Sequence, residues 1–151
     1  MKTYFKIILL SFILLNSVFG QTRCVPIPEG EQVFLIVDEM PVPNMDNAEF
    51  TELLNSKIDL SKYDLQPLET VFYGVTINCK GEALAFEIPR EINPELDKEI
   101  IRVIKSNMTW LPGKFQEETV DVRITERFHI VEGQFKFLNE KQLKKVRKRI
   151  K

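Results

Sequence analysis

The sequence from residue 93 to residue 130, NPELDKEIIRVIKSNMTWLPGKFQEETVDVRITERFHI, decides the fold. It begins with strong helix signals, because Asn93 is a favourable N-cap and Pro94 suits the first helical position. Acidic residues near this end and basic residues near the other end match the helix dipole. The apolar residues repeat at helical spacing and form one stripe, made of Leu96, Ile100, Val103 and Ile104. This stretch therefore predicts a helix with one buried face.

A turn and a long strand are predicted after this helix. Pro112 and Gly113 interrupt the chain. Apolar and polar residues then alternate from Val120 to Ile130, and only Glu126 disturbs the apolar set. Such alternation is typical of a strand with one buried face.

A β-hairpin is predicted before the helix. The residues from Val71 to Cys79 alternate with a period of two, and Lys80 with Gly81 makes a tight turn. The alternation then returns at Leu84, Phe86 and Ile88. The apolar stripe of the helix suits the apolar face of this hairpin. Strand, strand, helix and strand together predict an α+β fold, in which one helix packs on an antiparallel sheet made of the hairpin and the final strand.

A short helix is predicted in the segment that precedes the hairpin. Residues 22–32 are rich in Pro and Gly and predict an extended arm, and Val33–Val37 predicts a short β-type run. Asp46 as N-cap and Glu49 three residues later form a capping-box pattern. The apolar positions that follow predict a helix that ends near Lys57; they are Phe50, Leu53 and Leu54.

The first 20 residues have the features of a secretory signal peptide. Lys2 and Lys6 flank an almost wholly apolar run from Ile7 to Phe19, which is shorter than the about 20 residues that span a bilayer. Cleavage after Gly20 predicts a periplasmic or secreted protein. The alternative is a retained, slightly short membrane anchor, which would place the chain at the inner membrane.

The remaining chain has the size of one domain, and it contains two cysteines. Export would allow Cys24 and Cys79 to pair. A bridge would close a loop of about 55 residues and contribute roughly 4 kcal/mol on the chain-entropy account. The alternative is that Cys79 is a small buried apolar residue and Cys24 lies in a mobile arm.

The formal net charge of −1 hides a basic C-terminus. The basic residues there face one acidic residue, Glu140; they are Lys136, Lys141, Lys144, Lys145, Arg147, Lys148, Arg149 and Lys151. A tail of this kind can make a weak contact with an anionic membrane surface. The alternative is a solvated terminal helix that only keeps the protein soluble. The tail has no interleaved aromatic residues, so nucleic-acid binding is not expected.

No pattern in the sequence predicts catalysis, a cofactor or a metal site. The chain lacks a nucleophile elbow, a phosphate-binding glycine loop and a His or Cys cluster with metal-ligand spacing. His129 is the only histidine, and its polar position in the alternating strand predicts a surface residue. Trp110 lies between the helix and the Pro112 turn, where it is expected to fill the core. An enzyme is therefore not expected.

Several of these motifs resemble the C-terminal domain of TonB, the energy transducer of Gram-negative outer-membrane transport. The resemblance is carried by Asn93–Glu99, Trp110–Lys114 and Val120–Ile124, and it extends upstream to Val37–Pro43. The TonB-like fold has the same order of strand, strand, helix and strand. The expected divisions are a signal peptide (1–20), an N-terminal arm and helical segment (21–66), a TonB C-terminal-like domain (67–137) and a basic C-terminal helix or tail (138–151).

The resemblance implies a domain that binds proteins and catalyses nothing. In the TonB family, the last strand receives a short N-terminal segment of outer-membrane receptors by β-augmentation. Asp121, Arg123 and Thr125 would be the outward side chains of that edge. The chain departs from the family pattern at Asn44–Met45, Asp59–Leu60 and Glu117–Glu118. Carried onto this sequence, the pairing edge consists of Val120, Asp121, Val122, Arg123, Ile124 and Thr125.

Two functions from different classes follow. The first is a periplasmic protein-interaction module that pairs with outer-membrane transport receptors or other envelope proteins. The alternative is a structural or regulatory envelope protein that forms a homodimer through the sheet edge and touches an anionic membrane through its basic tail. Direct energy coupling would also need a long spacer, and residues 21–32 reach only about 40 Å when fully extended.

The signal-peptide features predict that the native protein starts at Gln21. Mass spectrometry of the protein purified from its own cells should give a chain that lacks the first 20 residues. A membrane fraction that contains the chain with Met1 intact would instead support the anchored form.

Overall fold

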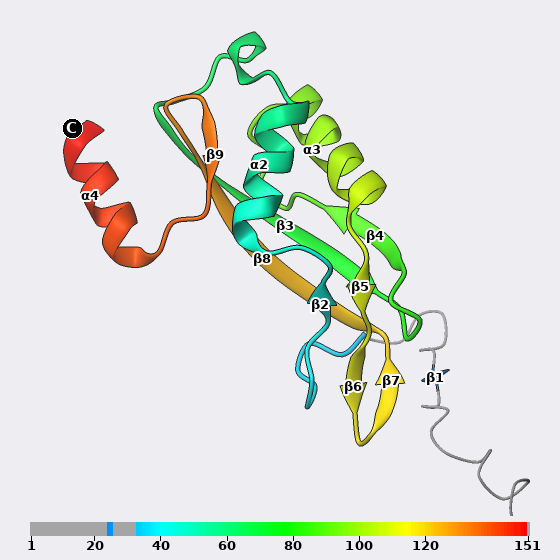
Figure 1. The fold of residues 1–151 in the computed structure, drawn as a ribbon. Helices are drawn as coiled ribbons and strands as arrows, with labels where there is room; N and C mark the ends of the chain where they lie inside the picture. Colours follow the sequence, from blue (N-terminus) through cyan, green and yellow to red (C-terminus); the bar gives the residue numbers. More distant parts are fainter. Residues whose placement is uncertain (1–23, 26–32, 151) are drawn as a thin grey trace, which may run out of the picture.

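The structure, a computed structural model, describes residues 24–25 and 33–150. Its main feature is a four-stranded antiparallel sheet with the strand order β4-β3-β8-β9 (Figure 1). The strands are β3 (Leu68–Ile77), β4 (Ala83–Glu87), β8 (Val122–Val131) and β9 (Gln134–Lys136). The helices are α2 (Asn47–Lys57), α3 (Pro94–Asn107) and α4 (Glu140–Ile150). The fold is therefore α+β, as the sequence predicts.

Short strands and one helical turn complete the described chain. A three-stranded sheet has the order β1-β7-β6 and a two-stranded sheet pairs β2 with β5. These strands are β1 (Cys24–Val25), β2 (Val42–Pro43), β5 (Trp110–Leu111), β6 (Gly113–Phe115) and β7 (Glu118–Val120), and the helical turn is η1 (Leu60–Lys62). The expected signal peptide (1–20) and most of the expected arm (22–32) lie outside the described residues. In the part of the chain that the structure describes, no helix combines the length and the apolar composition of a membrane span.

The pairing of β3 with β8 organises the sheet. All ten residues of β3 pair with all ten residues of β8, from Leu68 opposite Val131 to Ile77 opposite Val122. The β3–β4 hairpin was predicted at this place, and its turn needs Gly81, whose φ is +85°. A Cβ at Gly81 would collide with the backbone oxygen of Trp110. The hairpin prediction is confirmed.

Helices α2 and α3 lie on the same face of this sheet (Figure 1). Both begin at the predicted caps. The Asp46 carboxylate accepts the backbone N–H groups of Ala48 and Glu49 at 2.7 and 2.9 Å, and the Glu49 carboxylate accepts that of Asp46 at 2.9 Å. The Asn93 side chain accepts two N–H groups at the start of α3. The two helix predictions are confirmed.

One hydrophobic core fills the space between these helices and the sheet. The stripe of α3 predicted from the sequence is fully buried there, together with Phe50 and Leu54 of α2. Trp110 is also buried, with its ring 6.1 Å from that of Phe86, so the core role expected for it is confirmed. The sheet contributes Val71, Tyr73, Val75, Ile77, Phe128 and Ile130.

The long strand predicted from Val120 to Ile130 is interrupted. The structure has β7 up to Val120 and β8 from Val122, with Asp121 between them. Asp121 was expected to point outward, but it is buried, and its carboxylate accepts the backbone N–H of Cys79 at 2.8 Å. A buried carboxylate needs such a partner. Asp121 turns inward to accept the N–H of Cys79, and this contact explains why the alternating pattern misplaces it.

The predicted β-type run Val33–Val37 is reduced to a single bridge. Only Phe34 pairs with β8, opposite Val122. Leu35 and Ile36 are exposed, the latter by 83%. The apolar residues that suggested a strand therefore form no continuous ladder.

The C-terminal segment does form a helix, but α4 is not solvated on all sides. Its residue Leu143 is only 3% exposed. The ion pairs Arg127–Glu140 and Arg149–Glu132, at 2.6 and 2.8 Å, join α4 to β8 and to the β8–β9 turn. Arg127 lies on the face of β8 opposite to core residue Phe128, since neighbouring residues of a strand point to opposite faces. α4 therefore covers the face of the sheet that α2 and α3 leave free.

This cover corrects the prediction for His129. The ring was expected at the surface, but it is 1% exposed. Its Nδ1 lies 3.1 Å from the Thr70 hydroxyl, whereas its Nε2 has no hydrogen-bond partner among the described residues. Burial lowers the pKa of His129, and the charges of Arg127 and Arg147 lower it further. Glu140 and the backbone of Glu69 oppose this shift.

The lowered pKa of His129 predicts that the protein becomes less stable as the pH is lowered. Below the ordinary histidine value of 6.5, the unfolded chain binds a proton that the folded chain does not bind. When the pH is lowered from about 7.5 to about 5.5, the free energy of unfolding should therefore decrease. This decrease continues until the pH is below the pKa of His129 in the folded protein. Urea unfolding of the parent and of His129→Gln measures this. An equal loss in both proteins would show that His129 is not the group responsible.

Candidate functional site

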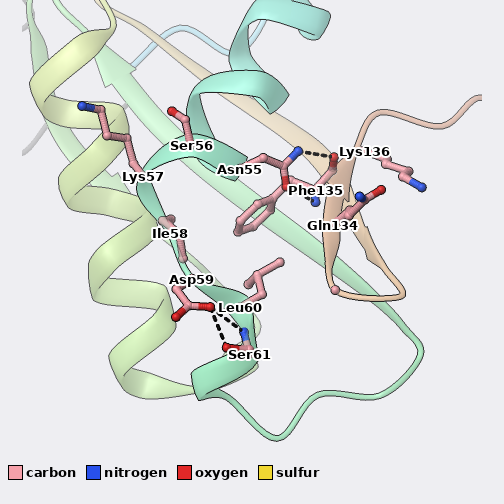
Figure 2. A pocket seen from close by; sticks show the side chains of 11 residues that line it. Asn55, Ser56, Lys57, Ile58, Asp59, Leu60, Ser61, Gln134, Phe135 and Lys136 are labelled. Atoms are coloured by element: carbon pink, nitrogen blue, oxygen red, sulfur yellow. Dashed lines mark hydrogen bonds between the residues drawn. The ribbon is translucent and has the colours of Figure 1, made fainter.

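The outer edge of β9 is closed by a side chain of α2. The Asn55 amide nitrogen donates to the backbone oxygen of Phe135 at 3.1 Å, and the Phe135 N–H donates to the Asn55 amide oxygen at 2.9 Å (Figure 2). One side-chain amide thus satisfies both backbone groups that Phe135 directs away from β8. A partner strand cannot use these groups without displacing Asn55.

A hollow of about 700 Å³ lies next to this contact, between the end of α2, η1 and the β8–β9 turn (Figure 2). Several of its polar groups are already engaged in local bonds. The Asp59 carboxylate accepts both the hydroxyl and the backbone N–H of Ser61, and these bonds lower the pKa of Asp59. Asn55 is held by Phe135. The Asp59 carboxylate and the Asn55 amide of the hollow are therefore both engaged in bonds within the protein.

The side of β8 that faces away from β3 is covered at its two ends. At one end, Phe34 donates its N–H to the oxygen of Asp121 at 3.2 Å and accepts the N–H of Arg123 at 2.9 Å. At the other end, β9 pairs with residues 129–131 of β8. No described strand pairs with this side between the two contacts.

The hydrogen bonds of Phe34 define which backbone groups face this uncovered stretch. The N–H and C=O groups of a strand residue point to the same side, and the direction alternates along the strand. Because the Arg123 N–H points away from β3, the backbone groups of Thr125 and Arg127 point away from β3 as well. Both residues are exposed. β8 therefore presents a short free edge centred on Thr125 and Arg127.

Three of the predicted site residues lie outside this free edge. Val120 is buried in β7, which pairs with β6 on one side and with β1 on the other. Asp121 is buried under the Cys79 turn, and Val122 is buried opposite Phe34. The structure therefore does not present Val120, Asp121 and Val122 as a free edge.

The other three predicted residues lie at or beside the free edge. Arg123 has its N–H bonded to Phe34, and its side chain forms an ion pair with Glu87 of β4. Ile124 packs against the core, and Thr125 is exposed. The edge is thus shifted toward the C-terminus of the predicted range, and Arg127 belongs to it although the sequence pattern did not include it.

A second hollow, of about 220 Å³, lies on the core side of this edge. Ile124 and Glu126 of β8 line it, and its apolar wall includes Phe50, Tyr73 and Trp110. Burial raises the pKa of the Tyr73 phenol, and the charge of Glu126 adds to the effect. The lining of the hollow is therefore mixed: aromatic side chains form one wall, and Glu126 places a carboxylate at its β8 side. Its remaining lining residues are Met40, Pro41, Pro43, Met45, Asp46, Asn47, Met108 and Phe137.

A disulfide ties the N-terminal arm to the β3–β4 turn, next to the start of β8. Cys24 is bonded to Cys79, with their Cα atoms 5.2 Å apart. This bond holds β1 parallel to β7, where Cys24 lies opposite Thr119. Of the two alternatives left open by the sequence, the structure has the bridge. Cys24 and Val25 of the arm, together with Phe34, therefore cover the start of the edge that the sequence suggested from Val120 onward.

The described residues contain no group of three or more His, Cys, Asp or Glu side chains that could hold a metal ion. Comparison with known proteins finds no matching family model, and no curated protein or solved structure with significant similarity. The resemblance to TonB therefore rests on the motifs quoted above.

The contact between Asn55 and Phe135 predicts a cost when it is lost. Asn55→Ala leaves two backbone groups of β9 without their partner, so the free energy of unfolding should fall by about 1 to 3 kcal/mol. Denaturant unfolding measures this change. Ser56→Ala, which removes only a local hydroxyl contact on the same helix turn, is the matched control. If the two variants are equally stable, the amide does not close the edge.

Proposed function

We propose that the chain is a non-enzymatic protein-interaction module of the TonB C-terminal type, which binds an extended segment of a partner by strand addition to β8. The observation that carries this proposal is the uncovered stretch of β8 between the Phe34 bridge and β9. Unpaired backbone groups at a sheet edge are a template for another strand.

The geometry limits the partner to a short segment. Five residues, 124 to 128, separate the two covered ends, which corresponds to about 17 Å of strand. Partner residues opposite Ile124 and Glu126 would direct their side chains to the core side of the sheet, beside the aromatic wall of this hollow. An apolar partner residue at this position would fill the hollow, and its neighbours would point to the other face.

The resemblance to TonB supplies the class of partner. In that family the added segment comes from the N-terminal part of outer-membrane receptors. For this chain, the proposed partners are such receptors or other envelope proteins. The disulfide agrees with a periplasmic or secreted location, because such bonds persist in oxidising compartments.

Proline at Thr125 tests strand addition directly. Thr125→Pro removes an N–H group that faces the free edge and adds a ring that a partner strand would meet. Binding of peptides copied from the N-terminal segments of outer-membrane receptors should weaken about tenfold or more. Isothermal titration calorimetry measures the affinity, and far-UV circular dichroism checks the fold.

Two matched variants complete this test. Thr125→Val keeps the backbone donor and should bind as the parent does. Glu126→Pro removes an N–H that points toward β3, so it should destabilise the sheet instead. Normal peptide binding by a folded Thr125→Pro protein would mean that the partner binds elsewhere.

A second candidate function is self-association through the outer edge of β4. No described strand pairs with this edge, and Leu84, the second residue of β4, is 59% exposed. An unpaired edge with an exposed apolar residue can pair with a second copy of the chain. Sedimentation velocity, together with the peptide titration, distinguishes the two functions. A monomer that binds receptor peptides supports strand addition to β8. A dimer that does not bind them supports pairing through β4.

A further inference from the structure

Helix α4 is held on the sheet in one orientation. Asn139 and Gln142 cap its start, because each side chain accepts the backbone N–H of the other residue at 2.9 Å. Leu143 is buried on the side that faces the sheet. The ion pairs Arg127–Glu140 and Arg149–Glu132 fix the two ends of the helix. The opposite side of α4 therefore faces away from the molecule.

Four lysines occupy that outward side. Lys141, Lys144, Lys145 and Lys148 follow the spacing i, i+3, i+4 and i+7, which places them on one face of a helix. All four are exposed, and none forms an ion pair with another described residue. They line a shallow hollow of about 450 Å³, and Glu140 is its one acidic residue. We call these four residues the lysine face. In Figure 1, α4 lies at the outside of the molecule, apart from α2 and α3.

The ion pairs of α4 explain why the positive charge is concentrated on this face. Glu132 in the β8–β9 turn and Glu140 at the start of α4 are each paired with an arginine. No described carboxylate is paired with the four lysine ammonium groups, so their positive charge is not offset by a neighbouring negative charge. An unpaired cluster of like charges raises the free energy of the fold, and it gains most from an anionic partner.

We propose that the lysine face binds the surface of an anionic lipid bilayer. Lysine ammonium groups are point charges on flexible stems, and they suit a fluid layer of phosphate headgroups better than a partner that requires fixed, bidentate geometry. The described helix contains no aromatic residue on which a nucleic-acid base could stack. Binding is electrostatic and does not insert the helix, because the apolar residue Leu143 is already buried against the sheet.

Vesicle binding tests this proposal. The protein is mixed with vesicles of equal parts phosphatidylglycerol and phosphatidylcholine, or of phosphatidylcholine alone, at about 50 mM NaCl. Each lysine near such a surface contributes about a fivefold factor to binding, so partition to the anionic vesicles should be at least about tenfold stronger. About 500 mM NaCl should remove the difference. If the apolar segment 7–19 is retained, it binds both vesicle types. The measured quantity is therefore the ratio of binding to the anionic vesicles over binding to the neutral vesicles.

Charge reversal locates the contact. Lys144→Glu with Lys145→Glu should reduce the preference for anionic vesicles at least about tenfold. The matched control reverses the exposed lysines Lys98 and Lys105 of α3, which changes the net charge equally and should alter the ratio less than about twofold. Equal binding to both vesicle types would overturn the proposal. So would an equal effect of the two double variants, or tighter binding to duplex DNA than to anionic vesicles at the same salt.

Discussion

The antiparallel pairing of β3 with β8 is the interaction on which the rest of the structure depends. It joins ten residues of each strand and uses the backbone groups of β8 that point in one direction. The groups that point the other way pair with Phe34 and β9 at the two ends of β8, and between these contacts they pair with no described strand. The same pairing sets the two faces of the sheet, so that Phe128 and Ile130 enter the core while Arg127 and His129 face α4.

Local patterns in the sequence were sufficient to predict the caps of α2 and α3 and the β3–β4 hairpin. The caps at Asp46 and Asn93 involve residues only a few positions away, so their spacing in the sequence already contains the contact. The hairpin turn at Gly81 is likewise local. These elements form where they were predicted because the hydrogen bonds that start and end them are short-range.

The errors came from contacts between distant segments. The alternation correctly assigned His129 to the face away from the core, but it could not show that α4 returns to cover that face. Asp121 is buried because it accepts the N–H of Cys79, which is 42 residues away. The free edge was placed too early because Cys24 and Val25 pair with β7 and Phe34 pairs with β8. Asn55 closes β9 from a separate helix, and nothing in its local sequence indicates this contact.

The two proposed surfaces lie on different parts of the molecule, and Arg127 belongs to both neighbourhoods. Its backbone faces the free edge of β8, and its side chain is paired with Glu140 at the start of α4. A strand added to β8 would order the backbone beside this ion pair. The lysine face itself lies on the far side of α4, so a partner strand would leave it accessible.

The central claim is that the backbone groups of Thr125 and Arg127 are unpaired in the free protein. Residue-resolved amide hydrogen exchange by NMR measures this most directly, because an N–H without a partner exchanges faster than one inside a ladder. The account predicts fast exchange at Thr125 and Arg127 and slow exchange at Glu126 and Phe128, whose N–H groups face β3. Protection of all four amides to the same degree in the monomer would contradict it, because this side of β8 would then already be covered.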